Sequence, residues 1–257
     1  MHKQYRKFNK DAGHKIIVLL FSMAMILSCA GNTNVSDRGV NVIVTSEKAS
    51  EEPLGDQSLE PSLWGTGNIN QIREYLPLIK RYSKIYGFDW RLILAVIQQE
   101  SNFDHNAVSP KGAYGLLQLM PETGEEIVSA VSHIYDYKTP EQNIVAGMHY
   151  LWTQFNRFYS RGMDSLECLK LALAAYNAGP GRVLDAQHLA LYLGRNPNEW
   201  ESVKLALSLL SPEYYTLHRY VWETGRPRSG YFKNYKETIN YVEKILRYYE
   251  KYKRLLK

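Results

Sequence analysis

The chain has few residues of the kinds that build cross-links and metal sites. Its 257 residues include two cysteines, Cys29 and Cys168, too few for a disulfide-stabilised scaffold. The seven histidines are scattered, and no set of His and Cys has metal-ligand spacing, so we expect neither a metal nor a cofactor. Long alternating strands, internal repeats and nucleic-acid-binding motifs are also missing. These absences argue against sandwich, barrel and solenoid folds, and against a nucleic acid as partner.

A long hydrophobic run is lacking too. The apolar run from Ile16 to Leu27 has twelve residues, too few for a membrane-spanning helix. Five basic residues precede it: Lys3, Arg6, Lys7, Lys10 and Lys15. The pattern is that of a signal peptide. It ends in Ser28-Cys29, which resembles the lipobox of bacterial lipoproteins, so residues 1–29 are expected to be a lipoprotein signal with Cys29 acylated. An ordinary signal peptide or an uncleaved anchor are the alternatives.

The lipoprotein interpretation sets the expected location and the domain boundaries. Ala30 follows the cysteine, and by resemblance to known sorting signals this favours the outer membrane, with the protein facing the periplasm. Residues 30–68 are rich in Ser, Asn, Gly and acidic residues and are expected to form a flexible tether. Residues 69–257 then form one domain. Cys168, left without a partner among Leu and Ala neighbours, is expected to be a small core residue.

The composition suits a globular domain with a large aromatic content. Apolar residues make up 45% of the chain, enough for one sizeable core, and there are 20 Tyr and 5 Trp. Sugar-binding clefts use such rings, and so do packed cores. The net charge of +5 suits an anionic polymer or surface, although a solvated basic face explains it equally well.

Helical periodicity dominates from Ile72 onward. Apolar residues recur at spacings of three and four up to Ile85, and Gly87 ends this first helix. Asp89 is a good N-cap for a helix over 90–100. Residues 101–122 are mostly irregular, with room for a small hairpin. Further helices are predicted over 123–133, 141–159, 165–177 and 181–193, with two or three more in 199–254. The predicted fold class is mainly α, with at most a small β-hairpin.

Glu100 is the unusual residue of its helix. It follows a strongly apolar run and lies where the helix gives way to a Gly-rich segment. A carboxyl group at such a junction can face a cleft while its helix packs in the core. Partial loss of solvent would raise its pKa toward neutrality, as a general acid requires. The alternative is a glutamate near a helix end that simply stays in water.

Four sequence blocks resemble, in order, those of the soluble-lytic-transglycosylase family, related in fold to goose-type lysozyme. The blocks lie at residues 100–121, 140–151, 174–183 and 237–242. With the helices between them they cover residues 72 to about 250. The resemblance implies a lysozyme-like helical domain and makes Glu100 the catalytic residue.

A finer match lies between the third and fourth blocks. Residues 196–197, 200, 203–204, 209–210 and 214–215 are similar to the catalytic module of membrane-bound lytic murein transglycosylase F. That family normally carries a solute-binding-like domain before the catalytic one, and here only the expected tether precedes it. Regulation by such a domain is therefore not carried over.

The resemblance implies cleavage of peptidoglycan glycan strands at the β-1,4 bond between N-acetylmuramic acid and N-acetylglucosamine. Glu100 would protonate the leaving oxygen and then take a proton from the C6 hydroxyl, which closes a 1,6-anhydro ring. Ordinary glycosidases use two carboxylates. The next acid after Glu100 is Asp104, whose expected role is turn capping.

The remaining motif residues would bind the substrate. They are Ser109, Gln118, Tyr176, Asn177, Glu237 and Tyr241. Gln118 offers a donor and an acceptor to a sugar edge, and the tyrosine hydroxyls and the Asn177 amide could contact the reacting ring. Purely structural roles are the alternative: Tyr176 as a core tyrosine and Asn177 as a helix cap.

Two other functions remain open from the sequence. A lysozyme-like muramidase would use an activated water in place of the C6 hydroxyl, with Asp104 or another carboxylate assisting. A non-catalytic cell-wall-binding lipoprotein would keep the fold for adhesion. The retained Glu100-Ser101 pair argues against the second.

Overall fold

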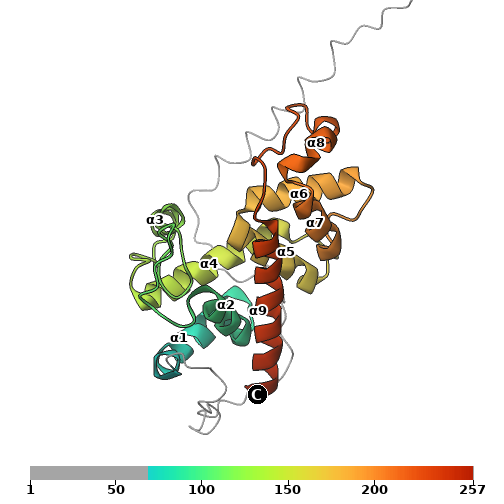
Figure 1. The fold of residues 1–257 in the computed structure, drawn as a ribbon. Helices are drawn as coiled ribbons and strands as arrows, with labels where there is room; N and C mark the ends of the chain where they lie inside the picture. Colours follow the sequence, from blue (N-terminus) through green and yellow to red (C-terminus); the bar gives the residue numbers. More distant parts are fainter. Residues whose placement is uncertain (1–68, 257) are drawn as a thin grey trace, which may run out of the picture. The chain divides into compact units, whose positions relative to one another are not determined.

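The computed structural model describes residues 69–256, and the expected signal peptide, Cys29 and tether lie outside this range. Within it the chain forms nine α-helices and a short 3-10 helix (Figure 1). Their bounds are α1 (Ile69–Tyr86), α2 (Trp90–Ser101), α3 (Pro121–Ala130), α4 (Pro140–Phe158), α5 (Ser165–Ala178), α6 (Pro180–Tyr192), α7 (Trp200–Ser208), η2 (Pro212–Tyr214), α8 (Tyr215–Val221) and α9 (Tyr235–Leu255). The predicted helices are all present, with ends displaced by a few residues.

The mainly α fold class is confirmed for the described residues. No β-strand forms among them, and in place of a hairpin two isolated antiparallel bridges join Tyr114 to Val108 and to Leu119. No helix of residues 69–256 combines the length and apolar character needed to cross a bilayer.

The start of α2 shows how local sequence fixes a helix that carries a site. Asp89 is extended (φ −68°, ψ 126°), and its carboxylate accepts a hydrogen bond from the Arg91 backbone N–H at 2.9 Å. This is the predicted N-cap, and it satisfies a backbone donor that the helix cannot. Residues 92–97 are then buried on every face. The helix is thus fixed in the core before it reaches Glu100.

The centre of the core is α5. Its residues 171–175 are fully buried, and α4, α6 and α9 pack around it. Cys168 is buried there as predicted, with its thiol donating to the Phe155 carbonyl oxygen at 3.3 Å. Burial raises the pKa of this thiol to about 12, so it is inert as a nucleophile.

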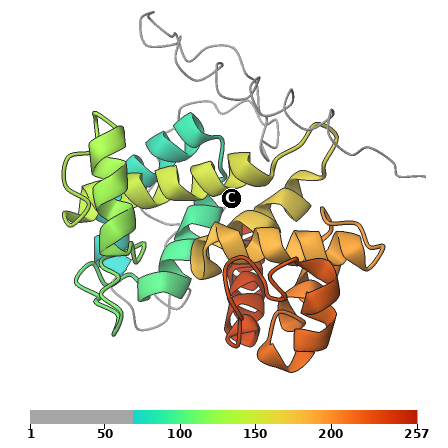
Figure 2. The same cartoon turned by 90° about the horizontal axis from the view of Figure 1, so that it is seen from above.

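The last helix, α9, joins segments far apart in the chain. It packs along α2 and α5, and α4 crosses its direction at a steep angle (Figures 1 and 2). Its buried face presents Tyr241, Val242, Ile245, Tyr249 and Tyr252, which recur at helical spacing. All three of these tyrosines donate hydrogen bonds to α2 or its cap: Tyr241 to Glu100, Tyr249 to Asp89 and Tyr252 to Gln98.

Asn143 of α4 shapes the loop between α2 and α3. This side chain is fully buried and accepts from the Leu117 N–H (2.8 Å) while donating to the Tyr114 and Tyr137 carbonyl oxygens (2.9 and 3.0 Å). Gly115 passes so close that a Cβ there would lie 2.6 Å from Asn143 Nδ2. A buried amide with all of these partners fixes one loop conformation.

Replacing Gly115 with Ala should destabilise the fold through both backbone strain and this contact. Gly115 has φ +81°, and Gly162, at φ +85° with open space within 4 Å of where a Cβ would lie, is the matched control. Gly162→Ala should cost about 1–2 kcal/mol from the left-handed backbone alone. Gly115→Ala should cost about 2 kcal/mol more, because the core is overpacked. Unfolding in urea measures both, and equal losses would contradict the role of the Asn143 contact.

Candidate active site

Glu100 lies on the last turn of α2, just before the chain leaves the helix. Asn102 adopts a left-handed conformation (φ 49°) and its N–H donates to the Gln98 carbonyl oxygen, which closes the helix. Phe103 and Gln118 also have positive φ, at 67° and 43°. It is unusual for three non-glycine residues of one loop to have positive φ. Backbone strain of this kind is often found at functional sites.

The carboxyl group of Glu100 is largely removed from solvent. Burial raises its pKa from an ordinary value of 4.5 to about 7, and a hydrogen bond from Tyr241 acts in the opposite direction. The phenol oxygen of Tyr241 lies 2.5 Å from Glu100 Oε1. Part of the residue stays accessible at the surface, as required of a group that reaches a substrate. A carboxyl group of this pKa can both give and take a proton near neutral pH.

Two further tyrosines complete the surroundings of Glu100. Tyr176 of α5 donates to the Leu117 carbonyl oxygen at 2.7 Å, and its ring centroid lies 5.0 Å from that of Tyr150. Burial, and next the charge of Glu100, hold the pKa of both Tyr176 and Tyr241 well above the ordinary phenol value. Both phenols therefore stay protonated and act as hydrogen-bond donors beside the carboxyl group.

Tyr150 and Asn143 had no individual role predicted from the sequence. With Gly147 they lie on one face of α4, at spacings of four and three residues. Gly147 lets α4 approach the loop, since a Cβ there would lie 2.5 Å from Leu117 Cβ. This shared face within the second sequence block is the signal that could have identified them.

Ser109 and Gln118 brace the loop. The Ser109 hydroxyl oxygen accepts from the Ala113 N–H at 3.0 Å. The Gln118 amide nitrogen donates to the carbonyl oxygens of Ala107 (3.0 Å) and Gly115 (2.9 Å). Both amide hydrogens of Gln118 are thus used within the protein, and only its amide oxygen is left for a ligand. The role of Gln118 in substrate binding stays a prediction, and in this structure the amide oxygen is the atom it offers.

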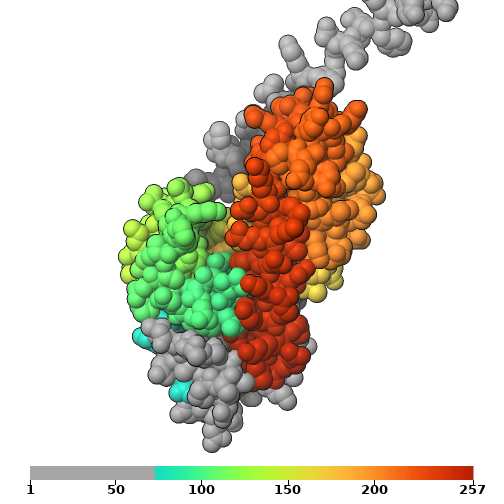
Figure 3. All heavy atoms as spheres, in the orientation of Figure 1, coloured from blue at the N-terminus to red at the C-terminus, as the bar shows by residue number. Residues whose placement is uncertain are grey.

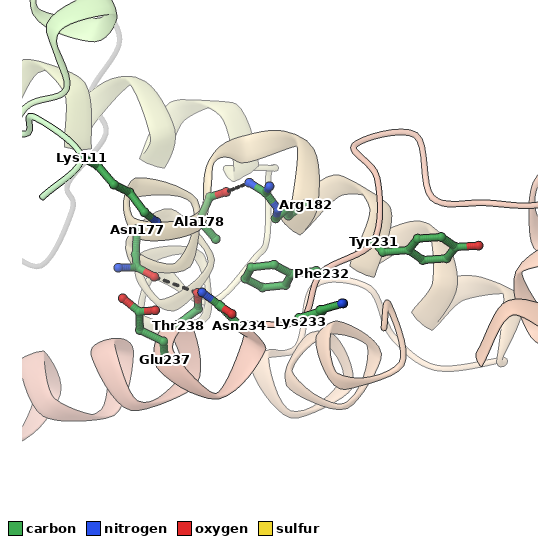
Figure 4. Close-up of a pocket in the computed structure, with 10 residues that line it drawn as sticks. All are labelled: Lys111, Asn177, Ala178, Arg182, Tyr231, Phe232, Lys233, Asn234, Glu237 and Thr238. Carbon is green, nitrogen blue, oxygen red and sulfur yellow. Dashed lines mark hydrogen bonds between the residues drawn. The ribbon is translucent and has the colours of Figure 1, made fainter. Parts of the chain in front are cut away.

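Asn177 and Glu237 are exposed and line a hollow of about 340 Å³ (Figure 4). The Thr238 hydroxyl donates to the Asn177 side-chain oxygen at 2.7 Å and orients this amide. Asn177 follows Tyr176 directly, and Glu237 lies one helical turn before Tyr241. The hollow thus adjoins the Glu100 group without including Glu100 itself. The space-filling view shows the surface indented between the green atoms near α3 and the red and orange C-terminal atoms (Figure 3).

Asp104 does not join this group. Its side chain is exposed and accepts from the Asn106 N–H at 2.9 Å, which is the predicted turn capping. Among the described residues no second carboxyl group contributes to the pKa shift of Glu100. The arrangement is one desolvated acid among tyrosine hydroxyls.

Part of the chain that carries this geometry is similar to a known family. Residues 77–196 match the family model of the transglycosylase SLT domain. The SLT segment contains Glu100, the braced loop, Tyr150 and Tyr176, whereas Glu237 and Tyr241 lie beyond it on α9.

Relatives extend the similarity past the SLT segment. Membrane-bound lytic murein transglycosylase F of Desulfosudis oleivorans is 40% identical over 185 residues, which cover 70% of this chain and 36% of the relative. The protein of that name from Haemophilus influenzae is 37% identical over 180 residues, with 70% and 34% covered. The chain thus spans about a third of the length of these curated relatives.

Among solved structures, the soluble lytic transglycosylase SLT70 from Escherichia coli is similar at 29% identity and a TM-score of 0.46. The similarity covers 70% of this chain and 24% of that one. SLT70 in complex with bulgecin A gives 28% identity and a TM-score of 0.46.

Replacing Tyr241 with Phe should raise the pKa of Glu100 above about 7, because the hydrogen bond that lowers it is removed while the burial remains. Carbon-13 NMR titration of labelled glutamate carboxyls measures this, with Glu100→Gln assigning the signal. Tyr249→Phe is the matched control, since it removes a buried phenol of α9 that donates to Asp89 instead. An unchanged or lower pKa in Tyr241→Phe alone would rule out this role for the phenol.

Proposed function

We propose that the protein is a peptidoglycan lytic transglycosylase that cleaves the β-1,4 bond between N-acetylmuramic acid and N-acetylglucosamine. The observation that carries the proposal is the single desolvated carboxyl of Glu100, with a pKa near 7 and no second acid coupled to it among the described residues. Its place in an SLT segment, and the names of the relatives, support the same reaction.

In the first step Glu100 donates its proton to the glycosidic oxygen while the bond from C1 to that oxygen breaks. The resulting carboxylate stabilises the positive charge that develops on the muramoyl ring. Tyr241 helps here, because its hydrogen bond favours the ionised form of Glu100. In an ordinary carboxylic acid of pKa near 4.5 this proton would be absent at neutral pH.

In the second step the same carboxylate takes the proton of the C6 hydroxyl, and O6 bonds to C1. The product is a 1,6-anhydro-muramic acid end, and Glu100 is protonated again. No water is consumed, so no second carboxylate is needed to activate one, unlike in ordinary glycosidases.

The substrate would lie along the exposed side of Glu100 and the tyrosines around it. Tyr176 and Asn177 would contact the reacting ring, and Glu237 would contact the neighbouring part of the glycan strand. Ser109 and the Gln118 amide oxygen would contact the substrate from the loop between α2 and α3. Cys29, outside the described residues, would be the acylated anchor. An outer-membrane location facing the periplasm is proposed with it, in keeping with the membrane-bound relatives.

The rival function is a muramidase, which would add water at C1 and yield a reducing end. The structure offers one specific observation relevant to it: Glu237 is an exposed carboxylate one turn from Tyr241. The products decide between the two reactions.

Incubating the full chain with purified peptidoglycan should release muropeptides with 1,6-anhydro ends. These are about 18 mass units lighter than hydrolysed ones, because O6 bonds to C1 and no water is added. Mass spectrometry reads both products. Glu100→Gln should reduce the rate at least about a hundredfold, the usual share of a general acid. Asp104→Asn, the same chemical change at a turn cap, should stay near the wild-type rate.

Reducing ends from the wild type would instead establish a hydrolase. A Glu100→Gln variant that cleaves at the wild-type rate would remove Glu100 from the mechanism.

The rate should also report the raised pKa of Glu100. Only the protonated acid can donate to the leaving oxygen, so kcat/KM should fall as the pH rises through about 7. An unperturbed glutamate would instead place this fall near 4.5. Measuring kcat/KM between about pH 5 and 9 locates the midpoint, and a midpoint below about pH 5.5 would exclude Glu100 in its buried form as the acid.

A further inference from the structure

Asp185 of α6 is a buried carboxylate whose partners are backbone groups. Its exposed fraction is 3%, and it forms no ion pair with another residue of the described part of the chain. Its two oxygens accept from the backbone N–H groups of Arg228 (3.3 Å) and Ser229 (2.7 Å). A buried carboxylate is unfavourable unless such donors compensate it, and hydrogen bonds to a charged acceptor are stronger than neutral ones. Asp185 therefore attaches α6 to a segment that begins 43 residues further along the chain.

The attached segment, residues 226–234, joins α8 to α9 and packs on the first turns of α6. Ser229 lies so close to Gly181 that a Cβ there would be 2.4 Å from the Ser229 Oγ. The Phe232 N–H donates to the Leu210 carbonyl oxygen at 3.0 Å. The segment ends where α9 begins, so its position sets where that helix starts.

The 226–234 segment separates two hollows. On one side its residues 231–234 line the hollow of about 340 Å³ that contains Asn177 and Glu237 (Figure 4). On the other side its residues 228–229 line a second hollow, of about 640 Å³, against α6. Open space on both sides leaves little packing to hold the segment, so its position depends on its hydrogen bonds. The bonds to Asp185 are those with a charged acceptor.

We propose that Asp185 is a positioning residue for substrate binding. It holds the 226–234 segment where the end of the segment and the start of α9 form one wall of the glycan-binding cleft. This role rests on the proposed function, which assigns Glu237 to the strand. Asp185 does not contribute to the pKa of Glu100, which burial and the Tyr241 hydrogen bond set. Loss of Asp185 should therefore weaken binding of the strand and leave the acid chemistry unchanged.

Glu167 of α5 offers a matched comparison, because it makes the same kind of contact away from the cleft. Its Oε2 accepts from the backbone N–H of Trp200, 33 residues further along the chain. Neither Glu167 nor Trp200 lines either hollow. A purely structural role for Asp185 predicts that removing either carboxylate lowers the melting temperature and has no other effect.

The test measures kcat and KM of the full chain on soluble, peptide-free glycan strands, with 1,6-anhydro ends counted as product. Asp185→Ala should raise KM about tenfold and change kcat less than about twofold, because two charge-assisted hydrogen bonds to the wall are lost. Asp185→Asn keeps the shape and one acceptor oxygen and should raise KM about threefold. The pH midpoint of kcat/KM should stay at about 7 in both variants. Glu167→Ala should keep the wild-type KM.

An unchanged KM in Asp185→Ala would overturn the proposal, and so would an equal rise of KM in Glu167→Ala. If the alanine variant does not fold, the comparison of Asp185→Asn with Glu167→Gln decides in the same way.

A binding measurement keeps this result separate from the proposed reaction. Calorimetry in the Glu100→Gln background should show the same strands binding about tenfold more weakly when Asp185 is also replaced with Ala. That loss would support the positioning role even if the wild type released reducing ends, which would refute the proposed reaction alone. Equal affinities with and without Asp185 would refute the positioning role.

Discussion

Glu100 is a carboxyl group taken out of water, and the packing around it has to compensate for that burial. The acid loses hydration that one phenol replaces only in part, so its position opposes folding. The contact joins residues 141 positions apart, so it exists only if α2 and α9 are held together by other means. Other contacts along the same pair of helices supply this: Tyr249 donates to the Asp89 cap, Tyr252 to Gln98, and Arg91 to the Leu256 carbonyl oxygen. These contacts hold α9 against α2, and they thereby position Tyr241 beside Glu100.

The loop after α2 is held rigid by its own hydrogen bonds. Several residues of the first sequence block therefore have a structural role in this loop. Ser101, next to Glu100, donates to the Leu116 carbonyl oxygen at 3.0 Å and ties the helix end to the far side of the loop. Asn143 and Gln118 hold the same loop through their amides. A pattern that resembles a set of sugar-binding residues thus consists largely of residues that hold one another. Preorganised walls of this kind keep the acid and a bound ring in register without ordering the loop at each turnover.

Local sequence signals predicted the helices, the Asp89 cap, the capping role of Asp104 and the buried state of Cys168, because each depends on neighbours within a few residues. The group around Glu100 could not be derived in this way. Its members lie on four helices, and no periodicity specifies that Tyr241 meets Glu100, so this assembly came from family resemblance alone. Arg182 shows the limit of both approaches, because neither predicted its hydrogen bond to the Ala178 carbonyl oxygen or its place in the wall of the hollow.

The carboxyl group of Glu100 and the cations of the neighbouring hollow are electrically separate, although residues that line the two places are close along the chain. The pKa of Glu100 is set by burial against the Tyr241 hydrogen bond, and no lysine or arginine of the described residues lowers it. Lys111 and Lys233, which line the hollow, are exposed, so solvent screens their field. Had Lys111 or Arg182 acted directly on Glu100, the acid would lose its proton near neutral pH, and its charge state would change whenever an anion bound. The charge state of Glu100 therefore depends on its own burial and on Tyr241, and not on the cations of the hollow.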